Sequence, residues 1–377
     1  MNIQKLLLVL SLGLAISPAH AETGVTAKSI TLGQSAALSG PAAQLGMEMR
    51  DGAQAYFDHV NAMGGVAGRH IILKTLDDGY EADKAIANTR QLIDKDEVFS
   101  LFGYVGTPTS NAVLPLVAKE NLPFFAPFTG AQSLREPFNR NIFNIRASYF
   151  EETEKIIQHI TTLSINRIAV FYQNDAYGKA GLEGVTRAMK KRNIEIIAMA
   201  TVERNSVDVA KAVAQMKQAK PQAIVMISAY TSCAAFIKDM LKDGEANPIF
   251  WNISFVGSQA LSKELGKEGR GVMISQVVPA PWDDINPVVK EYKGLYLKTP
   301  GRQPGFVSLE GFIAAKVFVE GLKRAGANLS RESFVKAMEG ISSYDVGGFQ
   351  VKFSATNHNA SHFVDLTVIG KDGKFMR

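Results

Sequence analysis

The chain has very little cysteine, since Cys233 is the single one in 377 residues. An internal disulfide is therefore excluded, and the folded state must rely on a large apolar core. An excess of one charge sign is also missing, because 41 basic residues face 36 acidic ones and the formal net charge is only +5. No basic block with interleaved aromatic residues occurs, so we expect no nucleic-acid partner.

Motifs of nucleotide binding and of covalent catalysis are missing as well. The sequence has no G-x-x-x-x-G-K-[ST] loop, no G-x-G-x-x-G after the first predicted strand and no G-x-S-x-G elbow. His358 and His362 lie four apart in a loop or strand, where that spacing does not place two ligands on one face. Asp77 and Asp78 are adjacent, whereas acid–base catalysis needs facing side chains. We therefore expect no catalytic residue, no metal and no cofactor.

Long apolar runs are absent after the first residues. Lys5 precedes a short apolar run from Leu6 to Ile16, and small residues follow up to Ala21. A charged start, a short apolar middle and a small-residue end are typical of a cleavable secretory signal peptide, here residues 1–21. The run is too short to span a membrane comfortably, which argues against a membrane anchor. We expect cleavage after Ala21 and export to the periplasm.

Strand-like apolar segments alternate with amphipathic helix-like segments along the mature chain. Such strict alternation predicts βαβ units and parallel sheets, so the fold class is α/β. The alternation restarts after residue 152, which predicts two similar lobes. A late β-hairpin is predicted at 362–375, with Lys371-Asp372-Gly373 as its turn. The predicted strands are 29–40, 70–78, 98–104, 122–128, 165–175, 194–203, 222–230 and 247–254.

The segments that follow the predicted strands carry hydroxyls, small residues and aromatics. They are 38–41, 103–110, 127–131, 174–178, 229–232 and 252–255. Ligands of open α/β sheets bind outside the carboxyl ends of the strands, so these segments are the candidate lining of a small-molecule cleft. In the stretch GYVGTPTS, 103–110, a strand runs through a tight loop into a helix start. The free N–H groups of such a helix start favour an anionic group.

Five segments in fixed order resemble a known family: 33–71, 77–85, 103–131, 172–185 and 308–326. Together they resemble the leucine/isoleucine/valine-binding type of periplasmic solute receptors for ABC importers, over nearly the whole mature chain. The resemblance implies the type I periplasmic binding protein fold, two Rossmann-like lobes with parallel sheets joined by three hinge crossovers. It implies a first lobe of 24–147 plus 281–350 and a second lobe of 148–280 plus 351–377.

The resemblance also implies a ligand site between the lobes. In amino-acid binders of this family, a hydroxyl and backbone N–H groups of the first lobe hold the ligand carboxylate, and Thr107 matches that hydroxyl. Thr129 is expected to substitute for a hydroxyl that the family often has where Gly130 lies. Arg146 and Tyr149 fall on a crossover, where hinge packing is favoured over ligand contact. The implied ligand-binding residues are Leu45, Val105, Gly106, Thr107, Phe128, Thr129, Gly130, Tyr177, Tyr230, Ser254, Phe255 and Phe306.

One position departs from the amino-acid binders of the family. They hold the α-ammonium group with an acidic residue, and Ser254 matches that position. A buried ammonium needs a paired charge or good acceptors. We therefore expect an organic or aromatic acid in preference to a free amino acid, unless Glu310 or Asp283 points inward and restores the charge.

The sequence thus predicts a monomeric periplasmic receptor that delivers a small carboxylate-bearing solute to an inner-membrane ABC permease and ATPase complex. A second interpretation is a periplasmic sensing module that detects a ligand and reports to a signalling partner. A third is an exported enzyme, which the sequence disfavours because no reactive constellation is found in the predicted cleft.

Overall fold

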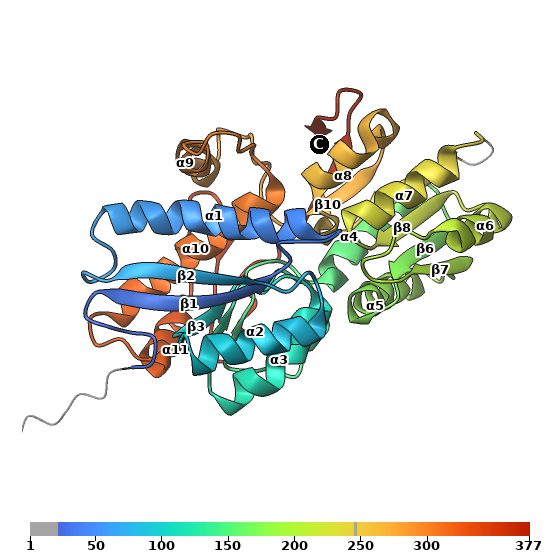
Figure 1. Cartoon of the computed structure of the whole chain (residues 1–377). Helices are drawn as coiled ribbons and strands as arrows, with labels where there is room; N and C mark the ends of the chain where they lie inside the picture. The colour runs from blue at the N-terminus through green and yellow to red at the C-terminus, as the bar shows by residue number, and fades with distance from the viewer. Residues whose placement is uncertain (1–21, 245–246) are drawn as a thin grey trace, which may run out of the picture.

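The computed structural model describes residues 22–244 and 247–377. The predicted signal peptide, residues 1–21, lies outside the described residues. Two sheets with parallel central strands lie in two separate lobes, each with helices packed against its sheet (Figure 1). The α/β class and the two-lobed architecture predicted from the alternating pattern are confirmed. No helix of the described residues is long and apolar enough to cross a membrane.

The first lobe contains a five-stranded parallel sheet in the order β2-β1-β3-β4-β5. Its strands are β1 (Ser29–Ala36), β2 (His70–Asp77), β3 (Ser100–Phe102), β4 (Phe124–Phe125) and β5 (Ile142–Phe143). The nearby helices are α1 (Ala43–Ala62), α2 (Ala82–Asp94), α3 (Thr107–Lys119), the 3-10 turn η1 (Gln132–Leu134), α9 (Pro287–Tyr296), α10 (Phe306–Ala325) and α11 (Arg331–Glu339). A small ribbon of β11 (Tyr344–Asp345) and β12 (Gln350–Val351) follows.

The second lobe contains a seven-stranded sheet in the order β14-β13-β10-β9-β8-β6-β7. Its parallel strands are β6 (Ile168–Gln173), β7 (Ala198–Val202), β8 (Ala223–Ile227), β9 (Ile249–Asn252) and β10 (Met273–Gln276). The antiparallel strands β13 (Asp365–Ile369) and β14 (Phe375–Met376) confirm the predicted hairpin. The helical elements are α4 (Tyr149–Thr162), α5 (Ala176–Lys190), α6 (Ala210–Ala219), α7 (Tyr230–Leu241), η2 (Ser254–Val256), α8 (Ser258–Leu265) and η3 (Gly266–Gly269).

The chain passes between the lobes three times: after β5, after β10 and after β12 (Figure 1). The third passage first runs along the first lobe, because the rings of Phe353 and His358 lie 5.5 and 3.9 Å from the ring of Phe143. The three hinge crossovers of the predicted fold are therefore present. The residue boundaries predicted for the lobes stay a prediction.

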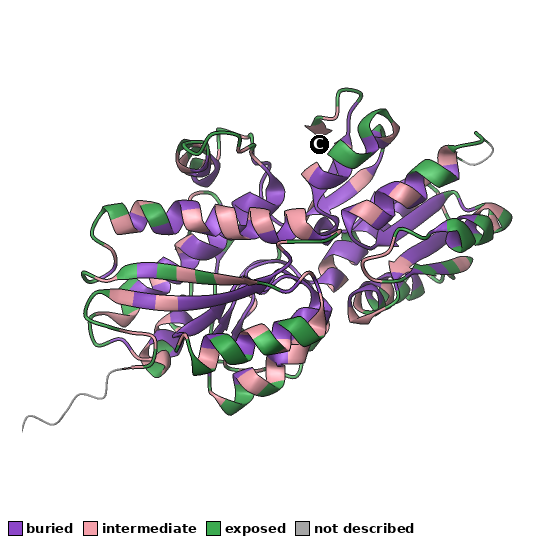
Figure 2. Cartoon of the chain, in the orientation of Figure 1, coloured by how far each residue is buried: buried purple, intermediate pink, exposed green. Residues whose placement is uncertain are grey.

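Burial follows the layers, with central strands and inward helix faces buried, while polar helix faces and the edge strand β2 are largely exposed or half-buried (Figure 2). Every residue of β8 is buried, as expected for a central parallel strand covered on both faces. Helices α1 and α10 approach closely where glycines face backbone. A Cβ atom on Gly52 would lie 1.8 Å from the carbonyl oxygen of Ser308, and one on Gly311 would lie 2.2 Å from that of Met49.

We expect Gly52→Ala to lower the free energy of unfolding by about 1 to 3 kcal/mol, because the added methyl group forces α1 away from α10. Urea unfolding of both proteins measures the change. Gly294→Ala in α9 is the matched control, because a Cβ there meets nothing within 4 Å. That control should gain up to about 1 kcal/mol through helix propensity alone. Equal stability of Gly52→Ala and the wild type would contradict the close α1–α10 contact.

Candidate functional site

The candidate site is the interface between the two lobes, where loops after strands of both sheets meet. The ring of Phe255, from the second lobe, lies 6.0 Å from that of Tyr80 and 5.3 Å from that of Phe128, both of the first lobe. At the edge of this interface, Asn205 Nδ2 donates a hydrogen bond of 3.0 Å to the carbonyl oxygen of Gly79. The structure therefore has the lobes closed onto each other.

Aromatic rings form the centre of this interface. Tyr177, at the start of α5, lies 4.5 Å from Phe255 and 5.5 Å from Tyr149, measured between ring centroids. All three side chains are fully buried. The Tyr177 hydroxyl has no hydrogen-bond partner within the described part of the chain. Because buried hydroxyls are normally bonded, this one is a candidate ligand contact.

A group of hydroxyls lies at the start of α3, as the sequence predicted for Thr107. Thr107 Oγ1 is 2.7 Å from Thr129 Oγ1, which lies 3.2 Å from the Tyr149 hydroxyl. No side chain caps the helix at Gly106, so N–H groups of the first turn remain available. The hydroxyl of Ser110 is buried and has no partner among the described residues. This end of α3 can therefore donate hydrogen bonds to an anionic group.

Gly106 has a structural role in the same loop. Its φ of 103° lies in a region that favours glycine. A Cβ atom there would lie 2.2 Å from the ring of Tyr80. The glycine thus allows the ring of Tyr80 to lie against the loop before α3, although the sequence analysis did not select Tyr80. Val105 is held to Phe128 by an isolated parallel bridge, which joins the two predicted gripping loops of the first lobe.

Arg146 is the principal residue that sequence reasoning undervalued. Its side chain is 1% exposed, and its guanidinium lies over the ring of Phe128, 4.5 Å from the centroid. Nη2 donates a hydrogen bond to Ser254 Oγ across the lobe interface. Nε and Nη1 have no hydrogen-bond partner within residues 22–244 and 247–377. Arg146 therefore presents unused donors inside the closed interface.

Two buried carboxylates flank this guanidinium. Glu310 Oε1 lies 3.6 Å from Nε, and Glu152 Oε1 lies 3.8 Å from Nη2. Burial lowers the pKa of Arg146, but the carboxylates of Glu310 and Glu152 outweigh burial and raise it. Of the two acids named as alternatives for Ser254, Glu310 points inward, whereas Asp283 lies 3.6 Å from Arg377 and is partly exposed.

Glu152 is a site residue that the sequence analysis missed. Its carboxylate accepts hydrogen bonds from Ser254 N at 2.8 Å, Ser254 Oγ at 3.0 Å and Ser275 Oγ at 2.6 Å. Burial raises the pKa of Glu152, although Arg146 and these donors oppose the rise. Its neighbour Glu151 caps α4 and is partly exposed. The two adjacent acids differ only in their position around the helix axis, which places one in the interface and the other at the surface. No local sequence signal distinguishes them.

The remaining predicted residues are Gly130, Leu45, Tyr230 and Phe306. Tyr149 packs against Gly130, where an added Cβ would lie 2.4 Å from the tyrosine ring. Leu45 reaches the second lobe, since its Cδ2 would be 2.5 Å from a Cβ on Gly257. The Tyr230 hydroxyl accepts a long hydrogen bond of 3.5 Å from the backbone N–H of residue 44. Phe306 lies apart, with its ring against those of Trp282 and Phe375.

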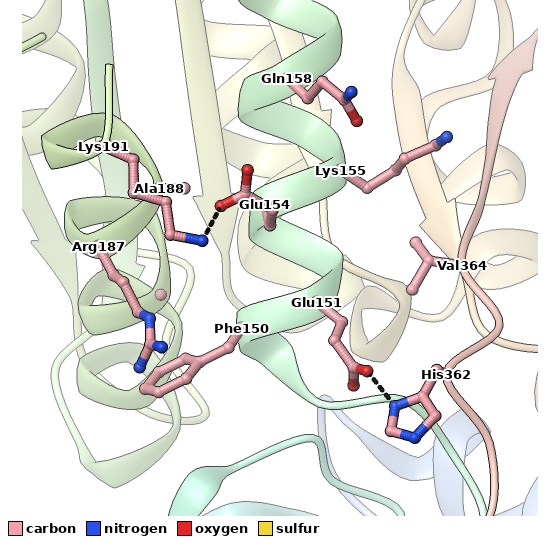
Figure 3. A pocket seen from close by; sticks show the side chains of 11 residues that line it. Phe150, Glu151, Glu154, Lys155, Gln158, Arg187, Ala188, Lys191, His362 and Val364 are labelled. Carbon is pink, nitrogen blue, oxygen red and sulfur yellow. Dashed lines mark hydrogen bonds and ion pairs between the residues drawn. The ribbon is translucent and has the colours of Figure 1, made fainter. Parts of the chain in front are cut away.

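A hollow lies on the surface of the second lobe, between α4, α5 and residues 362–364 (Figure 3). Its acids pair with neighbouring bases: Glu154 with Lys191 at 3.0 Å, and Glu151 with His362 (Figure 3). The described residues contain no cluster of three or more potential metal ligands. Because Arg146 and Tyr177 carry unpartnered buried donors at the lobe interface, that interface is the better candidate site.

Glu310 makes stability depend on pH. Burial raises its pKa from 4.5 to about 7, with Arg146 opposing and Glu152 adding to the rise. The folded state thus binds more protons than the unfolded state between these values. We expect the free energy of unfolding to fall by up to about 1.4 kcal/mol per unit as pH rises from 4.5 to about 7.

Denaturant unfolding across this pH range measures the contribution of Glu310. In Glu310→Gln this contribution to the slope should vanish. Glu320→Gln, on the same helix but in a partly exposed ion pair with Arg324, controls for the substitution itself. An unchanged slope in Glu310→Gln would contradict the assignment.

The chain matches the model of the periplasmic binding protein family over residues 29–374. A possible leucine/isoleucine/valine-binding protein from Rhodopirellula baltica is 34% identical, with a TM-score of 0.89 over 93% of this chain and 97% of that one. A solute-binding protein of an ABC transporter from R. palustris, solved in complex with benzoate, has the same fold at 20% identity, with a TM-score of 0.82 over 92% of this chain and 95% of that one.

Sequence relatives agree with these structures. The Leu/Ile/Val-binding protein homolog 3 of Brucella melitensis is 21% identical and covers 89% of this chain and 90% of its own length. The resemblance found in the ordered sequence segments is thereby confirmed. The chain belongs to the periplasmic binding protein family, of the Leu/Ile/Val-binding type, and is a binding protein and not an enzyme.

Proposed function

We propose that this protein is the periplasmic substrate-binding component of an ABC importer for a small organic acid with an apolar, preferably aromatic, body. The observation that carries the proposal is the buried guanidinium of Arg146, which has unpartnered N–H groups and lies among aromatic rings. Family membership and the ABC solute-binding relative of the same fold support the transport role.

A carboxylate suits this environment for physical reasons. Arginine presents its N–H donors in a planar fork that matches a carboxylate, and such charge-assisted bonds are strong. The start of α3 adds the hydroxyl of Thr107 and free backbone N–H groups. The rings of Tyr177, Phe255 and Phe128 offer apolar walls for the body of the solute.

The proposed ligand contacts fall on both lobes. In the first lobe they are Leu45, Val105, Gly106, Thr107, Phe128, Thr129 and Gly130, and in the second lobe Tyr177, Tyr230, Ser254 and Phe255, whereas Phe306 is left out because its ring packs on Trp282 and Phe375. A solute that bridges them favours the closed form by its greater affinity for that form. The membrane permease and ATPase complex then recognises the closed shape, which the protein adopts as a monomer.

A free amino acid is the second candidate solute, because of Glu152. Ser254 matches the position of an acid that holds an ammonium group in amino-acid binders. The Glu152 carboxylate bonds to both the backbone N–H and the hydroxyl of Ser254, so an acid from α4 reaches the same place. An α-ammonium group could be accepted there. The two candidates differ only in whether the solute needs an amino group.

Thermal unfolding of the chain from Glu22 to Arg377 with a solute panel tests the proposal. The panel contains benzoate, phenylacetate, 4-methyl-2-oxopentanoate, leucine, valine and small amides. A ligand at about 100 times its Kd should add about 2.7 kcal/mol of stability. We expect stabilisation by acids without an amino group. Stabilisation by leucine or valine alone would favour the second candidate, and none by any acid or amino acid would contradict a carboxylate-bearing solute.

Tyr177→Phe separates ligand contact from packing. The Tyr177 hydroxyl has no partner among the described residues, so its removal should leave the ligand-free protein as stable as the wild type or slightly more so. Binding of the best acid of the panel should weaken roughly 3- to 10-fold, as isothermal titration calorimetry would measure.

Tyr104→Phe is the matched control for this variant. The Tyr104 hydroxyl bonds to Thr89 at 2.8 Å inside the first lobe, away from the interface. Its loss should lower stability by about 1 kcal/mol and leave affinity unchanged. Equal affinity of Tyr177→Phe and the wild type would remove Tyr177 from the proposed contacts.

A further inference from the structure

Two acids share one arginine in the closed interface, and all three side chains are buried. The Arg146 guanidinium lies between Glu310, 3.6 Å from Nε, and Glu152, 3.8 Å from Nη2. The exposed fractions of the three side chains are between 0% and 5%. Two buried carboxylates beside one guanidinium ionise together only when cations compensate both charges, and they titrate as a coupled pair.

The two carboxylates have different hydrogen bonding. Glu152 accepts three hydrogen bonds, two from Ser254 and one from Ser275, and such donors favour the ionised form. Glu310 accepts no hydrogen bond from any residue within 22–244 and 247–377, and its contact with Arg146 is an ion pair only. Burial raises the pKa of both acids, and Glu310, which lacks hydrogen-bond donors, is therefore the one that is more easily neutralised.

One more cation faces the pair. Arg135 is buried and donates hydrogen bonds to the carbonyl oxygens of Ala131 and Arg146, at 2.9 and 3.0 Å. The charged groups of the described chain that act on Glu310 are thus Arg146, Glu152 and Arg135. When all four groups are ionised, the two positive charges cancel the two negative ones. The closed interface is electrically balanced before any solute enters.

An anionic solute disturbs this balance. Its carboxylate brings a fifth charge into a region of low dielectric, where an uncompensated charge costs several kcal/mol. The solute also competes for the guanidinium that offsets Glu310. Protonation of one carboxylate restores neutrality at a smaller cost, and the carboxylate without hydrogen-bond donors is the one to accept the proton.

We infer that the interface takes up one proton with each anionic solute that it binds, and that Glu310 receives this proton. The inference rests on the proposed function, because only an acid without an amino group adds net charge. The proton comes from the solvent, bonds to a Glu310 carboxylate oxygen and returns to the solvent when the lobes open and the solute leaves. Glu310 is then a specificity-determining residue, because it decides how tightly an anion is held at a given pH.

Proton uptake makes affinity depend on pH. For an acid that is ionised in solution, affinity should fall up to about tenfold per unit as pH rises above the Glu310 pKa of the ligand-free protein. A zwitterionic amino acid adds no net charge and should show no such fall. Glu310→Gln, which is neutral at every pH, should bind the acid with a nearly flat pH profile.

Isothermal titration calorimetry in two buffers of different ionisation enthalpy measures the proton number directly. Benzoate and 4-methyl-2-oxopentanoate serve as anionic probes at about pH 8, where both are ionised, and leucine serves as the zwitterionic probe. We expect uptake of about 0.5 to 1 proton per bound acid in the wild type and in the control Glu320→Gln. Uptake should be near zero in Glu310→Gln.

Two results would overturn this inference and leave the proposed function intact. One is an acid that binds the wild type without proton uptake, and the other is full proton uptake retained in Glu310→Gln. The pH profile of wild-type affinity gives a second readout that needs no variant. If neither acid binds at any pH and only leucine binds, the organic-acid proposal itself fails, and the inference of proton uptake fails together with it. These outcomes are distinct, because the first two require measurable binding of an acid.

Discussion

The buried guanidinium of Arg146 is the interaction on which the arrangement of the site depends. A buried cation must be paired, and its partners come from distant segments of the chain. Ser254 belongs to the second lobe, Glu152 to the start of α4 and Glu310 to α10, while Phe128 lies under the guanidinium plane. Phe128 and Glu310 belong to the first lobe, so the closed arrangement of the lobes adds Ser254 and Glu152 of the second lobe to them around Arg146.

The fold supplies the conditions under which this charge is effective. Parallel strands bring the loops after their carboxyl ends to one edge of each sheet, and the two edges face each other. Aromatic rings from both lobes, such as Phe128 and Phe255, pack against each other and exclude water from the interface. A low dielectric strengthens a correct ion pair and makes an unbalanced charge costly. The acids beside Arg146 therefore set the charge balance of the interface together with the arginine.

Local patterns in the sequence predicted the elements well but their ends less well. The strand predicted at 194–203 is present only as β7 (Ala198–Val202), because its first residues do not pair with the sheet. A local rule selected the segments 103–110 and 174–178, since both follow strands, and the family resemblance singled out Thr107 and Tyr177 within them. Glu152 could not be located in this way. It follows the partly exposed Glu151 at a helix start, and only helix packing shows which carboxylate is buried.

The sequence by itself determined the α/β alternation, the two lobes, the absence of reactive motifs and the resemblance to a family of solute receptors. These properties depend on periodicity, on spacing and on ordered motifs, which are local in the chain. Only the tertiary structure decided that Arg146 contacts Ser254, 108 residues away, and that Glu310 and Glu152 flank it. Residue spacing does not encode such contacts, because they arise when two separately folded lobes close and desolvate their charges together.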